Sequence, residues 1–152
     1  MNAPVSLAPV DGVDATTFRA AFRRLAGGVA VITVGRGAGR TGLTATSVVS
    51  FSAEPAILVF TLDGASSTRP VLEREGRFGV AFLAFEQRAV AERFAGVGGL
   101  KGAARYDGAA WTTAATGAPL LVGALAALDC EVEETIERHG RLLVFGRIRA
   151  AL

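Results

Sequence analysis

The sequence predicts a mainly β domain in which several strands form a barrel and a few short helices pack outside it. Three observations support this fold class. Apolar, β-branched runs recur at short intervals, glycine-containing turns separate them, and the helical patterns between them are short. Strands that alternate regularly with longer helices would instead indicate a doubly wound sheet. The chain of 152 residues is long enough for one domain with a sizeable core.

Composition limits the possible functions. Apolar residues make up 51% of the chain, but no apolar run approaches the roughly 18 residues of a membrane span. The net charge is +2 and the basic residues are scattered, which argues against nucleic acid binding. The single cysteine, Cys130, excludes an internal disulfide and fits a reducing, cytoplasmic compartment. Because there is also only one histidine, a metal-ligand cluster or a Ser-His-Asp nucleophile is not expected, and an enzyme of this composition would depend on a bound cofactor.

The N-terminal region predicts a tail followed by a helix. Residues 1–13 lack the positive segment and apolar core of a signal peptide, so we expect a flexible tail there and the domain over 14–152. Asp14 can cap a helix over about residues 15–25. Its apolar face would contain Phe18, Phe22 and Leu25.

The next segments predict paired strands. Residues 29–34 form a β-branched strand, and the glycine-rich loop over 35–40 leads into another strand. A phosphate-binding glycine loop would lead into a helix, so that interpretation is poor. A hydroxyl-rich strand is expected over 43–52, with Thr44, Thr46 and Ser50 on one face. An almost wholly apolar, buried strand follows over 56–63.

The remaining pattern continues the barrel. We expect a helix over 69–75 ended by Gly76, a strand over 78–82, a helix over 86–94, and a glycine- and alanine-rich loop over 97–109. A last hairpin begins near residue 124 and turns at His139-Gly140. In its first strand Leu128, Cys130, Val132 and Ile136 alternate with Asp129, Glu131, Glu133, Thr135 and Glu137, and the returning strand carries Arg147 and Arg149. This alternation predicts one wet acidic face, which the two arginines could meet across the hairpin.

Two groups of hydroxyl side chains are candidates for a binding site. The row on strand 43–52 could be a solvated strand face or the rigid edge that holds a planar heterocycle. Ser66-Ser67-Thr68 precede a helix whose first N–H groups are unpaired, which suits an anion, although an ordinary helix cap needs only one of them. Arg105 and Tyr106 could add a cation and an aromatic plane, or could belong to a solvated loop. Cys130 and Trp111 are expected in the core, and His139 in a solvated turn.

Several motifs, taken in order, resemble a known family. They are Gly42-Leu43-Thr44-Ala45-Thr46-Ser47…Ser50…Pro55, Ser66-Ser67-Thr68, Phe78-Gly79-Val80…Gln87…Arg93-Phe94-Ala95-Gly96, Arg105-Tyr106, Pro119-Leu120 and Ala126-Ala127-Leu128-Asp129-Cys130-Glu131-Val132. In this order and spacing they resemble the flavin reductase-like family, the small reductase components of two-component flavin monooxygenases. The resemblance covers Phe18 to Ile148.

The resemblance implies an FMN-binding split β-barrel of Greek-key type, built as a homodimer, that binds FMN or FAD. NADH or NADPH would pass a hydride to the flavin, and reduced flavin would leave for a separate flavin-dependent monooxygenase. The implied flavin-binding residues are Thr44, Ala45, Thr46, Ser47, Ser50, Asp63, Ser66, Ser67, Thr68, Phe94, Arg105 and Tyr106. Among these, Ser66 to Thr68 would hold the phosphate, and the last three would close the site. No side chain would act as a catalytic acid or base.

The final hairpin departs from the family pattern. Relatives often have Gly-Asp-His near the nicotinamide, whereas this chain has Gly140-Arg141-Leu142 with His139 just before. The frequent asparagine after Phe78 is Ala81. His139, Gly140 and Arg141 are therefore the implied nicotinamide residues on weaker grounds than the flavin residues. Two alternatives stay open: a flavin-binding or flavin-carrier module without reductase activity, and a barrel used only for dimerisation or interaction.

Overall fold

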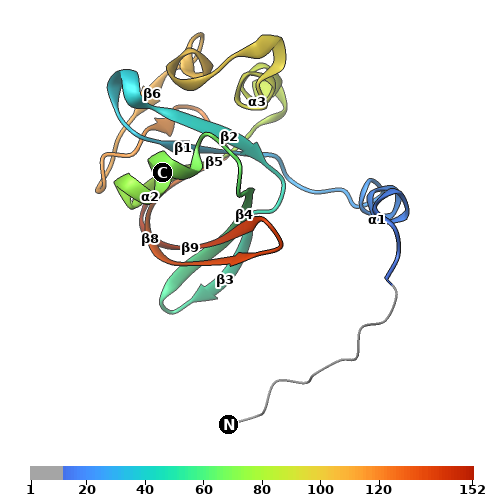
Figure 1. Ribbon diagram of the computed structural model, residues 1–152. Coiled ribbons are helices and arrows are strands. Elements are labelled where there is room, and N and C mark those ends of the chain that lie inside the picture. Colours follow the sequence, from blue (N-terminus) through green and yellow to red (C-terminus); the bar gives the residue numbers. More distant parts are fainter. Residues whose placement is uncertain (1–11) are drawn as a thin grey trace.

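The computed structural model describes residues 12–152, so most of the expected tail over 1–13 lies outside the described residues. One antiparallel sheet dominates, with its seven strands in the order β2-β1-β5-β8-β9-β4-β3. The strands are β1 Ala30–Val34, β2 Thr41–Ala45, β3 Val49–Ala53, β4 Ala56–Asp63, β5 Arg77–Phe82, β8 Ala126–Arg138 and β9 Arg141–Ala151. The sheet curls until β2 also contacts β4, which gives the barrel in Figure 1. The predicted mainly β class with short helices is confirmed.

Shorter elements cover the barrel. The helices are α1 Ala15–Phe22, α2 Arg69–Glu75 and α3 Arg88–Phe94, and single 3₁₀ turns lie at Gly37–Gly39, Phe85–Gln87, Val97–Gly99 and Gly102–Tyr106. A small second sheet pairs β6 Trp111–Thr112 with β7 Leu120–Leu121. Within residues 12–152, no helix has the length and apolar character needed to cross a membrane.

Two apolar clusters fill the interior. The larger one lies inside the barrel, where Phe60 and Phe78 meet edge to face with ring centroids 5.1 Å apart. The smaller one lies between the sheet and α3, where Phe94, Tyr106 and Trp111 pack together. Cys130 is fully buried in the larger cluster, and Trp111 packs against the smaller one, so both are core residues as expected.

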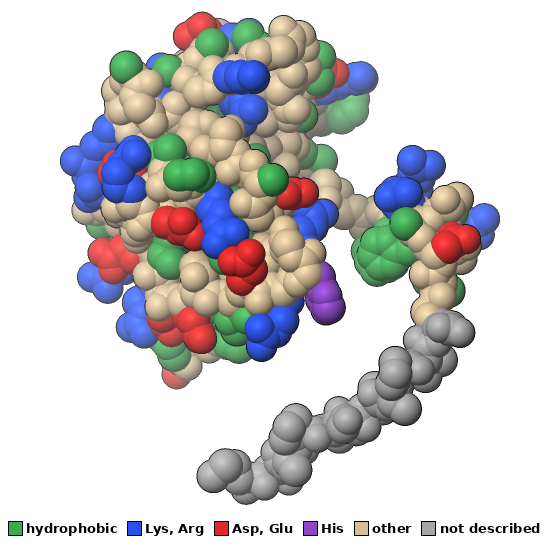
Figure 2. Space-filling view, viewed as in Figure 1, with side chains coloured by type: hydrophobic (Ala, Val, Ile, Leu, Met, Phe, Trp, Pro, Cys, Tyr) green, Lys and Arg blue, Asp and Glu red, His purple; other side chains and the backbone are tan. Residues whose placement is uncertain are grey.

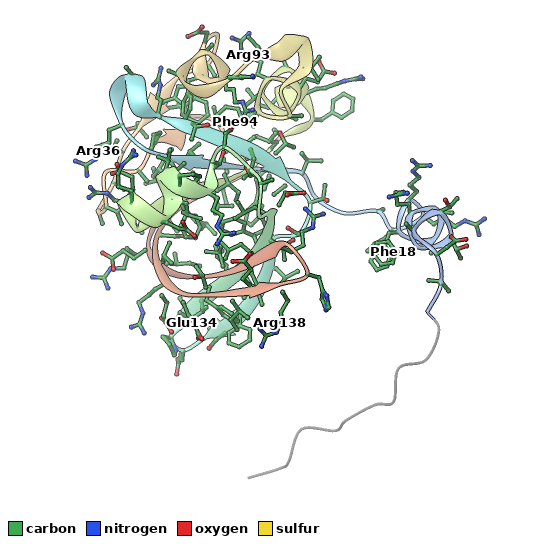
Figure 3. All side chains as sticks on the ribbon, viewed as in Figure 1. Phe18, Arg36, Arg93, Phe94, Glu134 and Arg138 are labelled. Atoms are coloured by element: carbon green, nitrogen blue, oxygen red, sulfur yellow. The ribbon has the colours of Figure 1, made fainter. Side chains whose placement is uncertain are left out.

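Local signals define several element ends as predicted. The Asp14 carboxylate accepts a hydrogen bond from Thr17 N (2.7 Å), and this bond lowers the pKa of Asp14. Helix α1 ends at Phe22, earlier than expected, and Phe18 stacks on Phe22 at an exposed face apart from the barrel (Figures 1 and 3). Gly76 ends α2 in the left-handed conformation.

The final hairpin confirms the predicted pairing of arginines with acids and corrects the predicted acidic face. Arg147 forms an ion pair with Glu133 (2.8 Å), and Arg149 lies 3.7 Å from Glu131. Basic and acidic side chains are accordingly intermixed on the face that Figure 2 presents. Asp129, however, is fully buried and does not belong to a wet acidic face. Its carboxylate accepts hydrogen bonds from the backbone N–H and the hydroxyl of Thr116, because the loop before β7 covers this part of β8.

The hydroxyl-rich segment is not one strand, contrary to the prediction for 43–52. It divides into β2 and β3 around Thr46 to Val48. β2 pairs with β1, whereas β3 pairs with β4, so the chain crosses from one edge of the sheet to the other. Thr44 and Ser50 therefore do not share a continuous face.

Candidate functional site

The break between β2 and β3 forms one wall of a cleft of about 360 Å³, which we call the hydroxyl cleft. The end of β4, the loop after it and the start of β9 form the rest. The lining residues are Leu43, Thr44, Ala45, Thr46, Ser47, Thr61, Leu62, Asp63, Ser66 and Arg141. The cleft thus gathers residues that lie almost a hundred positions apart in the sequence.

Hydrogen bonds hold the β2–β3 connection in place. Ser47 Oγ accepts from the backbone N–H of Thr61 (3.1 Å) and donates to its carbonyl (3.3 Å). This pair of bonds fixes the connection against β4. Thr46, in contrast, is exposed, and its hydroxyl has no hydrogen-bond partner among residues 12–152. Thr46 is therefore the strand-end hydroxyl that is free to contact a ligand.

Thr44 has an internal partner. Its hydroxyl donates to the carbonyl of Ala91 in α3 at 2.6 Å. This bond ties β2 to the helix behind it, so the Thr44 hydroxyl holds the wall rather than presenting a free group.

The three hydroxyls of the loop after β4 also have different surroundings. Thr68 is fully buried and donates to the carbonyl of Gly42 (3.1 Å), so it anchors the loop to β2 and is not available as a phosphate ligand. Ser66 lines the cleft, and its hydroxyl accepts from Thr68 N at 3.3 Å. Ser67 is exposed next to the cleft but does not line it. Only part of the predicted Ser66-Ser67-Thr68 set can therefore meet an anion.

Charged groups surround the cleft opening. Arg141 lies 3.3 Å from the Asp63 carboxylate, and both side chains are exposed. Arg69 is held more tightly, because it contacts Glu137 at 2.7 Å and Glu73 at 2.8 Å. The hydrogen bond to Glu137 contributes most to raising the pKa of Arg69, and the same bond lowers the pKa of Glu137. Two carboxylates thus balance the charge of Arg69, and Arg141 is the cation that lines the cleft.

The expected closing residues lie elsewhere. Phe94 and Tyr106 are each 1% exposed, and Tyr106 donates its hydroxyl proton to the carbonyl of Thr41 (2.6 Å). Burial raises the pKa of Tyr106. Arg105 donates to the carbonyls of Leu100 (3.2 Å) and Gly42. These three residues support β2 from behind and do not line the cleft, so their role in closing the site stays a prediction.

The remaining predicted residues are partly brought together. Gly140 accepts a hydrogen bond from the backbone N–H of Gly64 (2.8 Å), which joins the hairpin turn to the loop after β4. His139 is an exposed turn residue with φ near 50°, as expected, and does not line the cleft. Ser50 lies on β3 beside a separate apolar pocket of about 170 Å³. Only Arg141 of the implied nicotinamide residues lines the cleft.

Thr61 is a lining residue that the sequence reasoning missed. It is exposed on β4 between buried neighbours, and its alternation with Asp63 could have identified it. The complete lining offers hydroxyls, backbone groups, one carboxylate and one guanidinium, but no histidine or cysteine. Such a set can bind and orient a polar heterocycle with an anionic group, and the chemistry must come from what it binds.

Comparisons with known proteins give a consistent result. The family described as "Flavin reductase like domain" matches residues 22–152. The FMN reductase (NADH) RutF of Stutzerimonas stutzeri is 37% identical over 118 residues, which cover 78% of this chain and 67% of that protein. The 4-hydroxyphenylacetate 3-monooxygenase reductase component of Salmonella typhimurium is 35% identical over 84% of this chain and 75% of its own length. The crystal structure of the Streptomyces globisporus NADH:FAD oxidoreductase SgcE6 with NAD and FAD fragments has a TM-score of 0.82 and 28% identity, covering 96% of this chain and 86% of that one.

Proposed function

Because the chain belongs to the flavin reductase-like domain family, we propose that it is an NAD(P)H-dependent flavin reductase. It transfers a hydride from NADH or NADPH to FMN or FAD. The observation that carries the proposal is the hydroxyl cleft, where Thr46, Ser47, Ser66 and Arg141 come together from distant parts of the chain.

The hydroxyl cleft fits a flavin in size and in its chemical groups. Its volume of about 360 Å³ lies within the range of small-molecule sites, and it is open enough for part of the ligand to extend outside. Thr46 and the β2 end at Ala45 would meet the polar edge of the ring system. Ser66, Ser67 and Arg141 would meet the phosphate end, since hydroxyl and guanidinium groups are strong donors to phosphate.

The flavin supplies the redox chemistry when it is bound, by accepting a hydride from the nicotinamide. The task of the protein is then alignment, because direct hydride transfer between two stacked rings needs no side-chain acid or base. Positioning two reactants can contribute about 7–11 kcal/mol at best. The absence of histidine and cysteine from the lining is compatible with this division of tasks.

We further propose that reduced flavin leaves the cleft for a partner monooxygenase. One relative is named as the reductase component of a monooxygenase. Arg141 is the one guanidinium among the described lining residues and already pairs with Asp63, so charge-assisted bonds are confined to the phosphate end and the ring system is held by neutral hydrogen bonds. Neutral hydrogen bonds contribute about half as much as charge-assisted ones, which favours release.

We propose a homodimer on separate grounds. Val49 and Phe51 are exposed on β3, which is an edge strand of the sheet. Phe51 packs edge to face on Phe145 at 5.2 Å, so the apolar surface continues onto β9. Exposed apolar edges of this kind are interaction surfaces in soluble proteins. Light scattering should give twice the chain mass, and Phe51→Lys should shift the protein toward monomer; a monomeric wild-type protein would contradict the dimer.

The proposed activity is tested by mixing the purified protein with free FMN or FAD and with NADH or NADPH, while nicotinamide absorbance is followed. Absorbance should fall only when protein, flavin and nicotinamide are all present. If no combination gives protein-dependent oxidation, the reductase proposal fails. Flavin binding without oxidation would instead support the flavin-carrier alternative, which the departure at Gly140-Arg141-Leu142 keeps open.

A further inference from the structure

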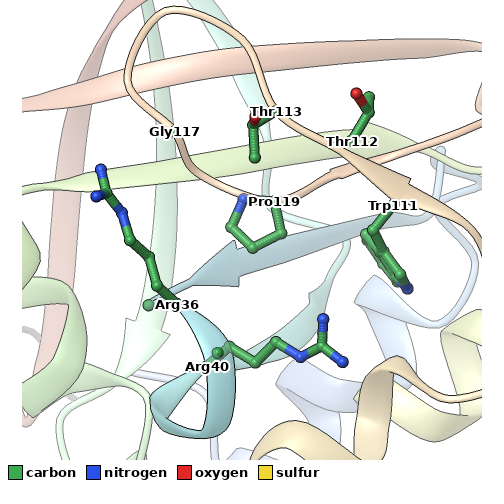
Figure 4. Close-up of a pocket in the computed structure, with 9 residues that line it drawn as sticks. Arg36, Arg40, Trp111, Thr112, Thr113, Gly117 and Pro119 are labelled. Carbon is green, nitrogen blue, oxygen red and sulfur yellow. The ribbon is translucent and has the colours of Figure 1, made fainter.

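A second cavity of about 560 Å³ lies at the other end of the β1–β2 hairpin from the hydroxyl cleft. The glycine-rich loop after β1 forms one wall, and β6 with the loop that follows it forms the other (Figure 4). We call it the arginine pocket. Its lining residues are Gly35, Arg36, Gly37, Arg40, Trp111, Thr112, Thr113, Gly117 and Pro119. None of them belongs to the proposed flavin site.

The wall opposite the glycine-rich loop is fixed by buried interactions. Thr116 is held by the buried carboxylate of Asp129, through its backbone N–H (2.6 Å) and its hydroxyl. The carbonyl of Thr116 accepts hydrogen bonds from Arg36 (3.0 Å) and from Arg77 (3.1 Å). The Thr33 hydroxyl donates to the carbonyl of Pro119. The pocket therefore exists before any ligand enters, which lowers the entropy cost of binding.

Gly117 makes room for one arginine. It adopts φ near 80°, and a Cβ at this position would lie 2.8 Å from Nη2 of Arg36. Arg36 can therefore extend toward this loop, as Figure 4 shows, and span the pocket wall. A residue with a side chain at position 117 would push the guanidinium away.

Arg40 is held as an unneutralised cation. Its guanidinium lies 4.3 Å from the ring centroid of Tyr106, and its buried Nε atom has no hydrogen-bond partner among the described residues. Neither Arg36 nor Arg40 forms an ion pair with any residue from 12 to 152. No acidic side chain lines the pocket. The pocket therefore carries positive charge that no carboxylate among its described lining residues neutralises, and this favours an anion.

The other lining groups select more than a bare anion. Trp111 lies between the two threonines and the end of Arg40 in Figure 4, and Pro119 lies between the two arginines. The indole and the pyrrolidine ring offer apolar surface, and a cavity of about 560 Å³ is much larger than a small inorganic ion needs. We propose that the arginine pocket binds a small aromatic anion, whose ring packs against Trp111 and Pro119 and whose anionic group meets Arg36, while Arg40 adds positive charge at the other end of the pocket.

Trp111 is the only tryptophan in the sequence, so its fluorescence reports on this pocket. The full-length protein, free of flavin, is titrated with benzoate and with phenyl phosphate, which distinguish a carboxylate from a phosphoryl group. Benzamide is the neutral isostere of benzoate, and acetate is the anion without a ring. We expect saturable quenching by at least one aromatic anion. Benzamide and acetate should each bind at least about tenfold more weakly, because benzamide lacks the charge that the arginine meets and acetate lacks the ring.

Variants test the assignment to the two arginines. Arg36→Gln should weaken the better aromatic anion about tenfold, and Arg40→Lys, which keeps a cation over the tyrosine ring, should weaken it less. Arg138→Gln is the matched control, because Arg138 is exposed on the far hairpin and its side chain donates a hydrogen bond to the carbonyl of Glu137, away from the pocket. The proposal is overturned if neither aromatic anion gives saturable quenching, if benzamide or acetate binds equally well, or if Arg36→Gln binds as the wild type does. None of these results depends on flavin reductase activity.

Discussion

The two threonines at the end of β2 provide a sharp test of the hydroxyl cleft. The Thr44 hydroxyl donates to the carbonyl of Ala91 at 2.6 Å, whereas Thr46 is exposed and lines the cleft without an internal partner among the described residues. Replacement of either residue by valine keeps the shape of the side chain and removes only the hydroxyl. The two variants should therefore fail in different ways.

The structure sets the size of each effect. The Ala91 carbonyl also accepts the helical hydrogen bond from Ala95 N (2.9 Å), so in Thr44→Val it keeps one partner. The free energy of unfolding should then fall by about 1 kcal/mol, the net value of one neutral hydrogen bond, and not by a full desolvation penalty. Flavin affinity should change less than about twofold, because the hydroxyl does not face the ligand.

Thr46→Val should show the opposite pattern. Loss of one neutral hydrogen bond to flavin corresponds to about 1 kcal/mol, or about fivefold in Kd. Stability should stay within about 0.5 kcal/mol of the wild type, as for most exposed substitutions. Urea unfolding followed by tryptophan fluorescence measures the stability, and a titration that follows FMN fluorescence measures the affinity.

Thr135→Val is the control for this pair, because Thr135 is an exposed strand residue on β8 that lies outside the cleft. It should change neither quantity. The reasoning is refuted if Thr44→Val weakens flavin binding as much as Thr46→Val while its stability is unchanged, since the Thr44 hydroxyl would then be a ligand rather than a structural donor.

Three further predictions follow from packing and titration. A Cβ on Gly146 would lie 2.3 Å from the buried ring of Phe78 in β5, so Gly146→Ala should lower the free energy of unfolding in urea by about 1–3 kcal/mol. Gly39→Ala is the control, because its Cβ would meet no atom within 4 Å, and equal stability of the two variants would contradict the packing argument. Because Arg69 lowers the pKa of Glu137, their pair stabilises the fold above the usual carboxyl pKa of 4.5, and this stabilisation is lost as the pH falls through the lowered pKa. Glu137→Gln should therefore lose less stability on acidification than the wild type does, and parallel curves of unfolding free energy against pH would contradict this. Burial raises the pKa of the Cys130 thiol to about 12, so a thiol reagent should label it quickly in urea and slowly in the native protein, and rapid native labelling would contradict its burial.

Much of the fold could be predicted because its signals are local. Asp14 caps α1, Gly76 ends α2, and the apolar run over 56–63 forms a buried strand. In each case, neighbouring residues alone decide the geometry: a carboxylate meets a helix N–H group, a glycine accepts positive φ, or apolar side chains leave water together.

The errors arose where distant partners decide the structure. Nothing in the strand propensity of Thr46 to Val48 marks a break. The break occurs because β2 pairs with β1 and β3 pairs with β4, at opposite edges of the sheet. The alternating pattern predicts that Asp129 shares a face with the exposed acids of β8. In the structure, Thr116 and its loop cover Asp129, and Thr116 donates hydrogen bonds to its carboxylate. A period of two identifies a shared face and cannot show what covers that face.

The site shows the same division. The sequence identified Thr46, Ser47, Asp63, Ser66 and Arg141 as candidates, and the fold places all five in one cleft. Hydroxyl groups alone do not reveal whether they face a ligand or a carbonyl of the protein, since both uses need the same side chain. The hydrogen bonds that the Thr44 and Thr68 hydroxyls donate to protein carbonyls depend on how distant segments pack, so the sequence alone does not predict them.

Anaerobic reduction of excess free FMN tests the central claim most directly. The protein is supplied in catalytic amount with NADH in excess over FMN, and the loss of oxidised flavin absorbance is followed without oxygen. A reductase that releases its product should reduce many equivalents of FMN per chain, at a rate that Thr46→Val lowers when FMN is below saturation. If the amount of reduced FMN stops at about one equivalent per chain, or does not exceed the protein-free control, the account of a cleft that aligns, reduces and releases flavin is contradicted.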